Sequence, residues 1–188
     1  MNDGTLEMRD GLPEALKVLL REYPREGWQN HENFHGLISF WLDRHLMFRE
    51  VMSKMRDLTE QSESGELEWQ AYAAQLSRYA RFFVQQLHGH HHMEDEHYFP
   101  ALMKFDDRLK RGFAILDSDH HELDGQLRGF TDAANLVIKP SSAMNIVSVT
   151  EQFHEVLSRF DRFLDRHLVD EEELVVPVIL KYGADDLL

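Results

Sequence analysis

The sequence has no cysteine, so disulfides, thiolate-held clusters and thiolate zinc sites are excluded. Proline and glycine number only five and ten in 188 residues, too few for a low-complexity chain. No apolar run approaches the roughly 18–20 residues that cross a bilayer, and the first residues lack the basic and apolar character of a signal peptide. We therefore expect one cytoplasmic domain, in which any metal is held by nitrogen and oxygen ligands.

Positive charge is also scarce. The chain has 20 Lys and Arg against 34 Asp and Glu, a net charge of −14. This balance argues against nucleic acids and anionic membranes as partners, and we interpret most of the carboxylates as solvated helix faces. Histidine, by contrast, is abundant at 12 residues. Because a single histidine is usually packed or on the surface, a metal site has to be inferred from histidines that share one level of a fold.

Two stretches, residues 90–100 and 167–177, are nearly equivalent. Each opens with a His, carries a Glu four residues later and has a Pro ten residues after the His. The two pairs are His90/Glu94 and His167/Glu171. Four residues turn about 400° on an α-helix, so each His and its Glu share one face, one turn apart. Two such helices facing each other could offer two imidazoles and two carboxylates to one point in a bundle core.

A further part of the repeat precedes each pair. An Asp-Arg-His run ends at His45 and a Ser-Asp-His run ends at His120, 45 and 47 residues before His90 and His167. Counted from a turn near residues 105–107, the second and third helices bring their histidines to a similar height. The chain is thus predicted to form two helical hairpins, each giving one His from its first helix and a His with a Glu from its second.

Apolar residues recur at helical spacing over four long segments, and we see no strand signal. Pro100 is expected to bend or end the second long helix. The predicted fold is all-α: an up-down-up-down four-helix bundle with a short extra N-terminal helix. The expected helices cover about residues 10–22, 30–60, 66–104, 108–137 and 143–182. The expected domains are an N-terminal extension over 1–29, the bundle over 30–182 and a C-terminal tail over 183–188.

This pattern of a His, then His-x-x-x-Glu, each occurring twice, resembles the hemerythrin-like (HHE cation-binding) family. Four His and two Glu on four helices suit a dinuclear site of a borderline metal such as Fe, Zn, Cu or Ni. The resemblance implies iron: two Fe ions bridged by Glu94 and Glu171 and by a solvent-derived oxo or hydroxo group. The predicted metal ligands are His45, His90, Glu94, His120, His167 and Glu171.

The sequence departs from the oxygen-carrying hemerythrins, which have a second His four residues after that of the third helix. Here that position is Asp124. The departure leaves one coordination position open to water, Asp124 or another side chain, and makes reversible oxygen storage doubtful. We predict a non-haem di-iron protein that reacts with or senses O2, NO or peroxide. The alternatives are a di-iron oxidase or peroxidase, an iron-handling or repair protein, and a bundle that the metal merely stabilises; whether the chain is an enzyme stays open.

Several histidines near the motifs leave alternatives open. His97 shares the face of His90 and could ligate or hydrogen-bond a carboxylate, and His121 competes with His120. His91 and His92 are expected to be exposed or to hydrogen-bond the ligands, unless the register shifts to His91/Asp95 or His92/Glu96. A rival pair of Glu-x-x-His motifs is Glu94/His97 and Glu151/His154, as in ferritin-like di-iron proteins. Counting residues from the turns separates the two rival motifs along the bundle, which argues against them.

Overall fold

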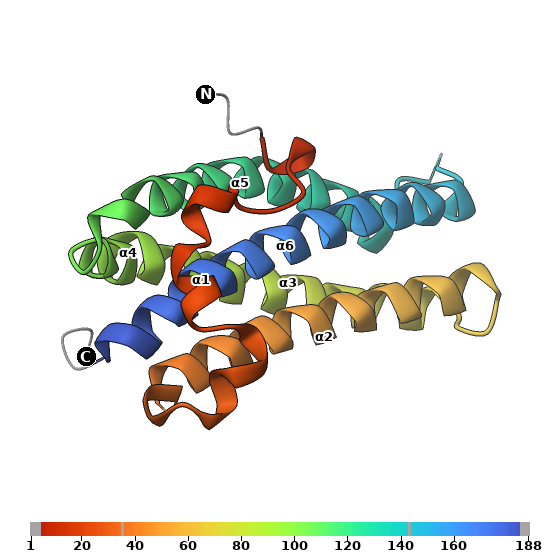
Figure 1. Ribbon diagram of the computed structural model, residues 1–188. Coiled ribbons are helices and arrows are strands. Elements are labelled where there is room, and N and C mark those ends of the chain that lie inside the picture. The colour runs from red at the N-terminus through yellow and green to blue at the C-terminus, as the bar shows by residue number, and fades with distance from the viewer. Residues whose placement is uncertain (1–4, 35, 143, 185–188) are drawn as a thin grey trace. The chain divides into compact units, whose positions relative to one another are not determined.

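The computed structural model describes residues 5–34, 36–142 and 144–184 (Figure 1). Within these residues every regular element is helical, so the predicted all-α bundle is confirmed. The part of the chain so described includes no helix long and apolar enough to cross a membrane. Four helices are long: α2 Leu37–Glu63, α3 Trp69–Met93, α5 Lys110–Ile138 and α6 Ile146–Tyr182. Of the predicted C-terminal tail, residues 185–188 lie outside the described part, as do residues 1–4 of the N-terminal extension.

The first long helix begins later than predicted. Where it was expected to start, Asn30 instead ends one short 3-10 helix, η3 Arg25–Asn30, and a second follows, η4 Glu32–Phe34. Gly36 adopts φ 66°, which interrupts right-handed helix and lets α2 begin at the next residue. The extra N-terminal helix is also shorter than predicted. It consists of η2 Glu14–Leu16 and α1 Val18–Glu22, preceded by η1 Leu6–Met8.

The second long helix changes its winding where the first His-x-x-x-Glu motif lies. After α3 the chain makes a π-helical turn, η5 Glu94–Tyr98, and then α4 Phe99–Leu102. Pro100 has no N–H to donate to the preceding turn, and the N–H of Phe99 bonds the carbonyl of Glu94 five residues back. The bend expected at Pro100 is therefore a wider turn that begins at Glu94. At Pro177 the helix does not change its winding, and α6 is continuous through this residue.

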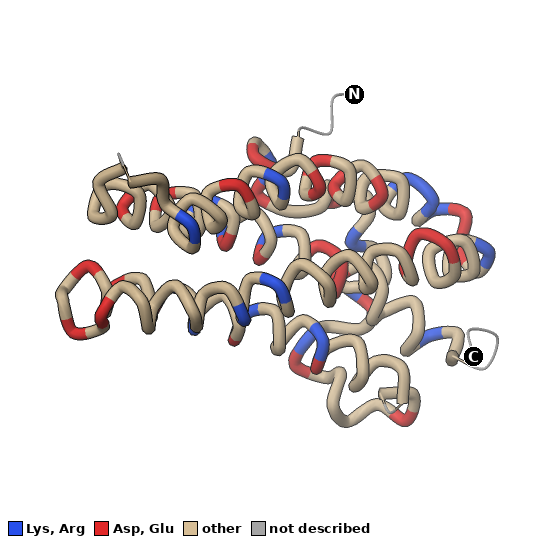
Figure 2. The backbone as a smooth tube through the Cα atoms, turned by 180° about the vertical axis from the view of Figure 1, so that it is seen from behind, with Lys and Arg blue, Asp and Glu red and all other residues tan. Residues whose placement is uncertain are grey.

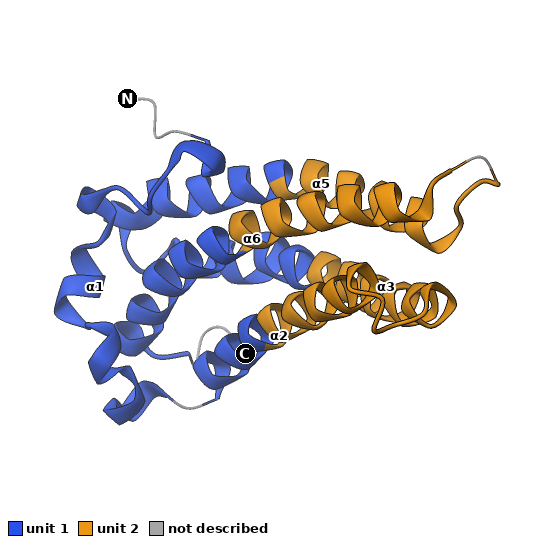
Figure 3. Ribbon diagram, turned by 90° about the vertical axis from the view of Figure 1, so that its right-hand side faces the viewer, with its two compact units in different colours: residues 1–46, 90–122, 165–188 blue, residues 47–89, 123–164 orange. Residues whose placement is uncertain are grey.

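The chain divides into two compact units, and each long helix contributes residues to both (Figure 3). Unit 1 comprises residues 1–46, 90–122 and 165–188, and unit 2 comprises 47–89 and 123–164. Unit 2 is built around packed aromatic rings; the centroid of Phe83 lies 5.8 Å from those of Phe130 and Phe160. Also in unit 2, Thr59 and Tyr72 share a buried hydrogen bond of 2.9 Å.

The core of unit 1 joins helix ends to the N-terminal segment. Buried side chains of α5 and α6, such as Phe113 and Val175, pack in one cluster with Leu12 and Leu19 of the N-terminal segment. Gly112 lets α5 come close to α6, because a Cβ there would lie 2.8 Å from Leu174 Cδ2. All six predicted ligands belong to unit 1.

Charged positions along the backbone are mainly acidic (Figure 2). Four acidic residues flank the turn between α2 and α3, where Gly65 adopts φ 78°, and all four are exposed. They are Glu60, Glu63, Glu66 and Glu68. These four residues agree with the prediction that most carboxylates are solvated. In unit 1, by contrast, several carboxylates are buried, Glu94 and Glu171 among them.

Candidate metal centre

Four of the predicted ligands meet in one group. The ligand atoms of His45, His90, Glu94 and Glu171 all lie within 4.8 Å of one another. They come from α2, α3, η5 and α6, and the Nε2 atoms of His45 and His90 are 3.1 Å apart. His45, Glu94 and Glu171 are buried, and the side chain of His90 is 9% exposed. Residues from α2, α3, η5 and α6 therefore bring nitrogen and oxygen donors into the same small volume.

The other two predicted ligands belong to a second group. His91, His120 and His167 offer nitrogens within 4.8 Å of one another, and all three side chains are buried. The Nε2 atoms of His120 and His167 are 3.1 Å apart. His120 also stacks on Phe99, with ring centroids 5.5 Å apart, so an apolar ring covers part of this group.

The two glutamates connect the groups. Glu94 Oε1 lies 3.0 Å from His90 Nε2, and Glu94 Oε2 lies 3.5 Å from His120 Nε2. Glu171 does the same for the other pair: Oε1 is 3.4 Å from His45 Nε2, and Oε2 is 3.5 Å from His167 Nε2. Each carboxylate thus turns one oxygen toward each group.

The donor atoms lack the hydrogen bonds that burial demands. Both oxygens of Glu94 and Oε2 of Glu171 are buried without a hydrogen-bond partner among the described residues, although imidazole nitrogens are near. Trp41 Nε1 donates to Glu171 Oε1. Buried carboxylates without partners are costly, and a bound cation would satisfy them. Imidazole and carboxylate donors are suited to iron as well as to zinc or copper, so the residues present fit the metal that the sequence predicts.

Further carboxylates fix the imidazoles from behind. Glu172 Oε1 lies 3.0 Å from Nδ1 of His45, and Asp95 Oδ1 lies 2.7 Å from Nδ1 of His120. A proton held on Nδ1 by such a carboxylate leaves Nε2 as the lone-pair donor toward the group. Asp119 Oδ2 faces Nδ1 of His167 at 3.6 Å, which is ion-pair range but too long for a hydrogen bond.

Burial and charge set the protonation of the metal-free centre. Burial raises the pKa of Glu94 well above its usual range, and the charge of Glu171 adds to this rise. Burial also opposes ionisation of Glu171, but the imidazoles of His45, His90 and His167 together outweigh it, and the pKa of Glu171 lies well below its usual range. Burial lowers the pKa of His90 to about 3 and that of His91 well below its usual value. The imidazoles of His90 and His91 are therefore neutral at physiological pH and need lose no proton to bind a cation.

His91 is the residue that the sequence reasoning misplaced. It was expected to be exposed or to hydrogen-bond a ligand, whereas it is 6% exposed and groups with His120 and His167. Successive residues on a helix point about 100° apart, so His90 and His91 can serve two neighbouring groups from one helix end. The shifted pair His91/Asp95 does not form, because Asp95 contacts His120. The run of three histidines was the signal that could have suggested His91.

Among the described residues, none of the remaining alternatives is a member of either group. His92, His97 and His121 are exposed, and His121 Nδ1 lies 2.8 Å from the carbonyl of Asp117. Asp124 is half-buried and belongs to unit 2. The two rival Glu-x-x-His motifs belong to different units: Glu94 and His97 to unit 1, and Glu151 and His154 to unit 2, where His154 contacts Glu63. His35 lies outside the described residues.

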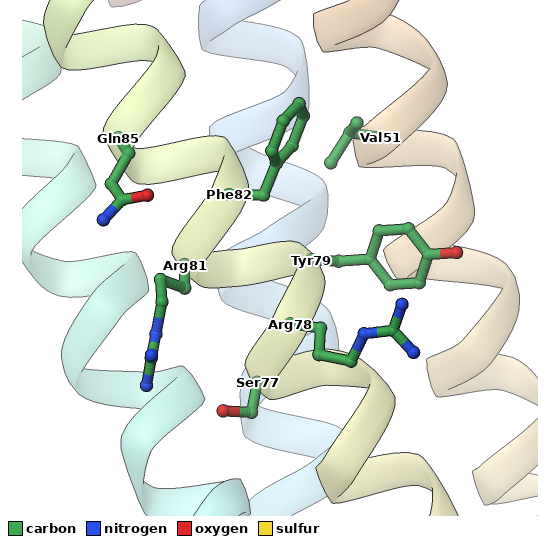
Figure 4. A pocket seen from close by; sticks show the side chains of 7 residues that line it. All are labelled: Val51, Ser77, Arg78, Tyr79, Arg81, Phe82 and Gln85. Carbon is green, nitrogen blue, oxygen red and sulfur yellow. The ribbon is translucent and has the colours of Figure 1, made fainter.

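A surface hollow of unit 2 offers no comparable chemistry (Figure 4). It measures about 640 Å³, and Tyr79 and Phe82 extend from α3 toward Val51 of α2. Its other lining residues are Ser77, Arg78, Arg81 and Gln85. None of these carries an imidazole or a carboxylate, so this hollow has no donors of the kind found in the two groups of unit 1.

Comparison with known proteins bears on the same residues. The family model of the hemerythrin HHE cation-binding domain matches residues 36–144, more than half of the chain. No curated protein and no solved structure matches the chain. The matched range includes His45, His90, Glu94 and His120, whereas His167 and Glu171 lie beyond it and join the centre through the geometry of α6. With its helical bundle and its paired His/Glu groups, the chain belongs to the hemerythrin HHE cation-binding domain family.

Proposed function

We propose that this cation-binding domain holds two iron ions, one at each of the two groups, with Glu94 and Glu171 shared between them. The observation that carries the proposal is the position of Glu94 and Glu171, each with one oxygen toward each group. Two separate mononuclear sites would not need shared carboxylates. A pair of cations close together requires negative charge between them, and these two buried side chains supply it.

The two positions differ in the number of imidazoles. One is offered two, from His45 and His90, and the other three, from His91, His120 and His167. With both carboxylates shared, the His45/His90 position keeps more room for an exogenous ligand. When bound there, iron supplies a redox change and a place for a small molecule such as O2, NO or peroxide. We propose that binding, sensing or reduction of such a molecule is the function of the domain.

Trp41 lies beside the His45/His90 position. Its indole ring lies 6.1 Å from His90 and 4.9 Å from Tyr98, centroid to centroid, and its side chain is buried. Its N–H holds Oε1 of Glu171, the oxygen that faces His45. The ring keeps water from this side of the position while the N–H fixes the carboxylate, so a small ligand meets an apolar wall and an ordered bridge.

His91 alters the argument that rests on Asp124. The absence of a second His on the third helix predicted an open coordination position, which made reversible oxygen storage doubtful. The structure offers a third imidazole beside His120 and His167 from α3. The number of imidazoles therefore no longer separates a carrier from a catalyst, and the reaction with oxygen has to be measured.

Iron content is the first test of this proposal. Protein expressed with sufficient iron should contain close to two Fe per chain by elemental analysis. A folded protein that reproducibly binds none under anaerobic loading with ferrous iron would overturn the proposal.

Stopped-flow spectroscopy of the reduced protein then distinguishes between the possible functions of the site. Repeated turnover of peroxide would favour an enzyme of the peroxidase type, and a single oxidation would favour a sensor. Uptake of oxygen that is reversed under vacuum would identify a carrier. Transfer of iron to an acceptor protein without any of these reactions would favour iron handling.

A further inference from the structure

The N-terminal segment contacts α5 and α6 beside the metal centre. The N–H of Leu6 donates to Glu122, and the N–H of Leu12 donates to Asp170 Oδ1 at 3.2 Å. Gly11, at φ 141°, permits the turn between them, since this backbone conformation is rarely adopted by other residues. These bonds attach a segment that precedes the region of the family match to two helices that carry ligands.

Arg9 connects this segment to both helices through buried ion pairs. It is 8% exposed and lies between Asp119 of α5 and Asp170 of α6. Its Nη1 and Nη2 donate to the two oxygens of Asp119 at 3.2 and 2.5 Å, and its Nε and Nη2 donate to Asp170 Oδ2 at 3.1 and 2.9 Å. A bidentate guanidinium fixes the plane of a carboxylate as well as its charge. The carboxylate that it fixes, Asp119, is the one that faces Nδ1 of His167.

Arg25 makes a parallel connection on the other group. Its Nη1 donates to Glu172 Oε2 at 2.7 Å, and Glu172 Oε1 lies 3.0 Å from Nδ1 of His45. The guanidinium also lies 4.7 Å from the ring centroid of Trp28, which limits its freedom. Glu172 is only 3% exposed, so its charge depends on these partners.

We propose that Arg9 and Arg25 are positioning residues of the metal centre, so that the N-terminal segment forms part of it. Arg9 acts through Asp119 on His167, a ligand of the three-imidazole position, and Arg25 acts through Glu172 on His45, a ligand of the two-imidazole position. The inference rests on the proposed function, since it requires iron at both positions. Carboxylates that hold metal-binding histidines change metal affinity by about 10–100-fold when they are lost. The same coupling must run in reverse, and iron in the centre should hold the N-terminal segment more firmly.

The test compares Arg9→Gln and Arg25→Gln with Arg21→Gln. Arg21 lies in the same segment, but its side chain is 60% exposed and its partner Glu14 is 77% exposed, so it serves as the control. Each variant is loaded anaerobically with isotopically enriched ferrous iron and then mixed with an excess of a ferrous chelator. We expect Arg9→Gln and Arg25→Gln to release iron about 10–100-fold faster than the unaltered protein, and Arg21→Gln to match it.

Mössbauer spectroscopy separates positioning from a general loss of stability. Arg9→Gln should change the signal of one iron and Arg25→Gln that of the other, because they act on different groups. Equal disturbance of both irons by each variant, or release rates equal to those of Arg21→Gln, would overturn the inference while the iron site itself stands. An unaltered protein that binds no iron would overturn the proposed function instead.

Hydrogen exchange tests the same coupling without any substitution. The amide of Leu12, which bonds Asp170, should exchange about 10-fold or more slowly in the iron-loaded protein than in the metal-free protein. Exchange that is identical in the two states would contradict the inference even if the arginine variants fail to fold.

Discussion

The imidazole rings of His91 and His120 stack with their centroids 4.0 Å apart and their planes at 13°. A ring nitrogen of each lies within 4.8 Å of the other and of one from His167, and Nε2 of His91 is buried without a hydrogen-bond partner among the described residues. A buried imidazole nitrogen without a partner is costly. Its position beside His120 and His167 gives it a use as a third nitrogen donor.

His91→Ala should therefore lower the iron content from two toward one per chain. The side chain removed is a donor of the three-imidazole position, so the iron held by His120 and His167 should be the one lost. His92→Ala is the matched control, because His92 is the next residue and is exposed. Elemental analysis after loading and gel filtration measures the difference. Two irons in both variants would show that His91 is packed beside the centre without binding to it.

Trp41→Phe tests the donor to Glu171. The substitution keeps an aromatic ring but removes the N–H that bonds Glu171 Oε1 in the metal-free protein. A buried hydrogen bond to a charged group contributes about 1.5–3 kcal/mol, so the free energy of unfolding should fall by that amount. Trp69→Phe should cost less, about 0.5–1.5 kcal/mol, since half-buried Trp69 donates to a neutral carbonyl, that of Val137. Urea denaturation measures both, and equal losses would contradict the role given to Trp41.

Much of this structure could be predicted because its signals are local. Helical periodicity located the four long helices. The repeated His-x-x-x-Glu spacing selected four residues and the repeated His before each pair selected two more, and the structure brings all six into two adjoining groups. Spacing fixes which face of a helix a residue occupies, and His90 and Glu94 depend on little else. That these residues bind iron stays a prediction.

The parts that could not be predicted depend on contacts distant in the sequence. Arg9 is a single arginine in a segment without periodicity, and its partners lie 110 and 161 residues away. The run Asp170, Glu171 and Glu172 looks like a solvated helix face, yet each is buried with its own partner: an arginine, the imidazoles or both. Nothing in a run of like residues says which of them faces the core.

Tyr72 predicts a loss of stability at alkaline pH. Burial raises the pKa of Tyr72 to about 12, although its bond with Thr59 works against the rise. Unfolded tyrosine ionises near pH 10, so between about pH 10 and 12 only the unfolded state loses the proton and is favoured. The free energy of unfolding should fall by up to about 2.7 kcal/mol over that interval, in addition to the effects of other groups.

Tyr72→Phe should remove this part of the pH dependence. The variant loses the hydrogen bond to Thr59, so it should be less stable at neutral pH by about 1 kcal/mol and then decline less steeply above pH 10. Tyr79→Phe, at a half-buried position on the same helix, is the control. Urea unfolding from pH 9 to 11 compares the slopes, and parallel slopes for the unaltered protein and Tyr72→Phe would exclude Tyr72 as the cause.

Glu94→Gln and Glu171→Gln should differ in the metal-free protein and agree in the metal-bound one. The raised pKa of Glu94 means that its carboxyl is neutral without metal, so an amide of the same shape should change the free energy of unfolding little. The lowered pKa of Glu171 means that it is ionised beside His45, so Glu171→Gln should destabilise the metal-free protein by about 3 kcal/mol, as expected for breaking a buried pair.

Both substitutions remove an oxygen that bridges the two groups, so both should abolish the stabilisation that iron confers. At a free iron concentration 100-fold above the dissociation constant, that stabilisation is about 2.7 kcal/mol for one site. Glu96→Gln is the control, since Glu96 lies in the same π-helical turn as Glu94 but is exposed. Thermal unfolding with and without ferrous iron measures all three variants. If Glu94→Gln retains the full shift caused by iron, Glu94 does not bridge two ions, and the shared position of its two oxygens reflects packing alone.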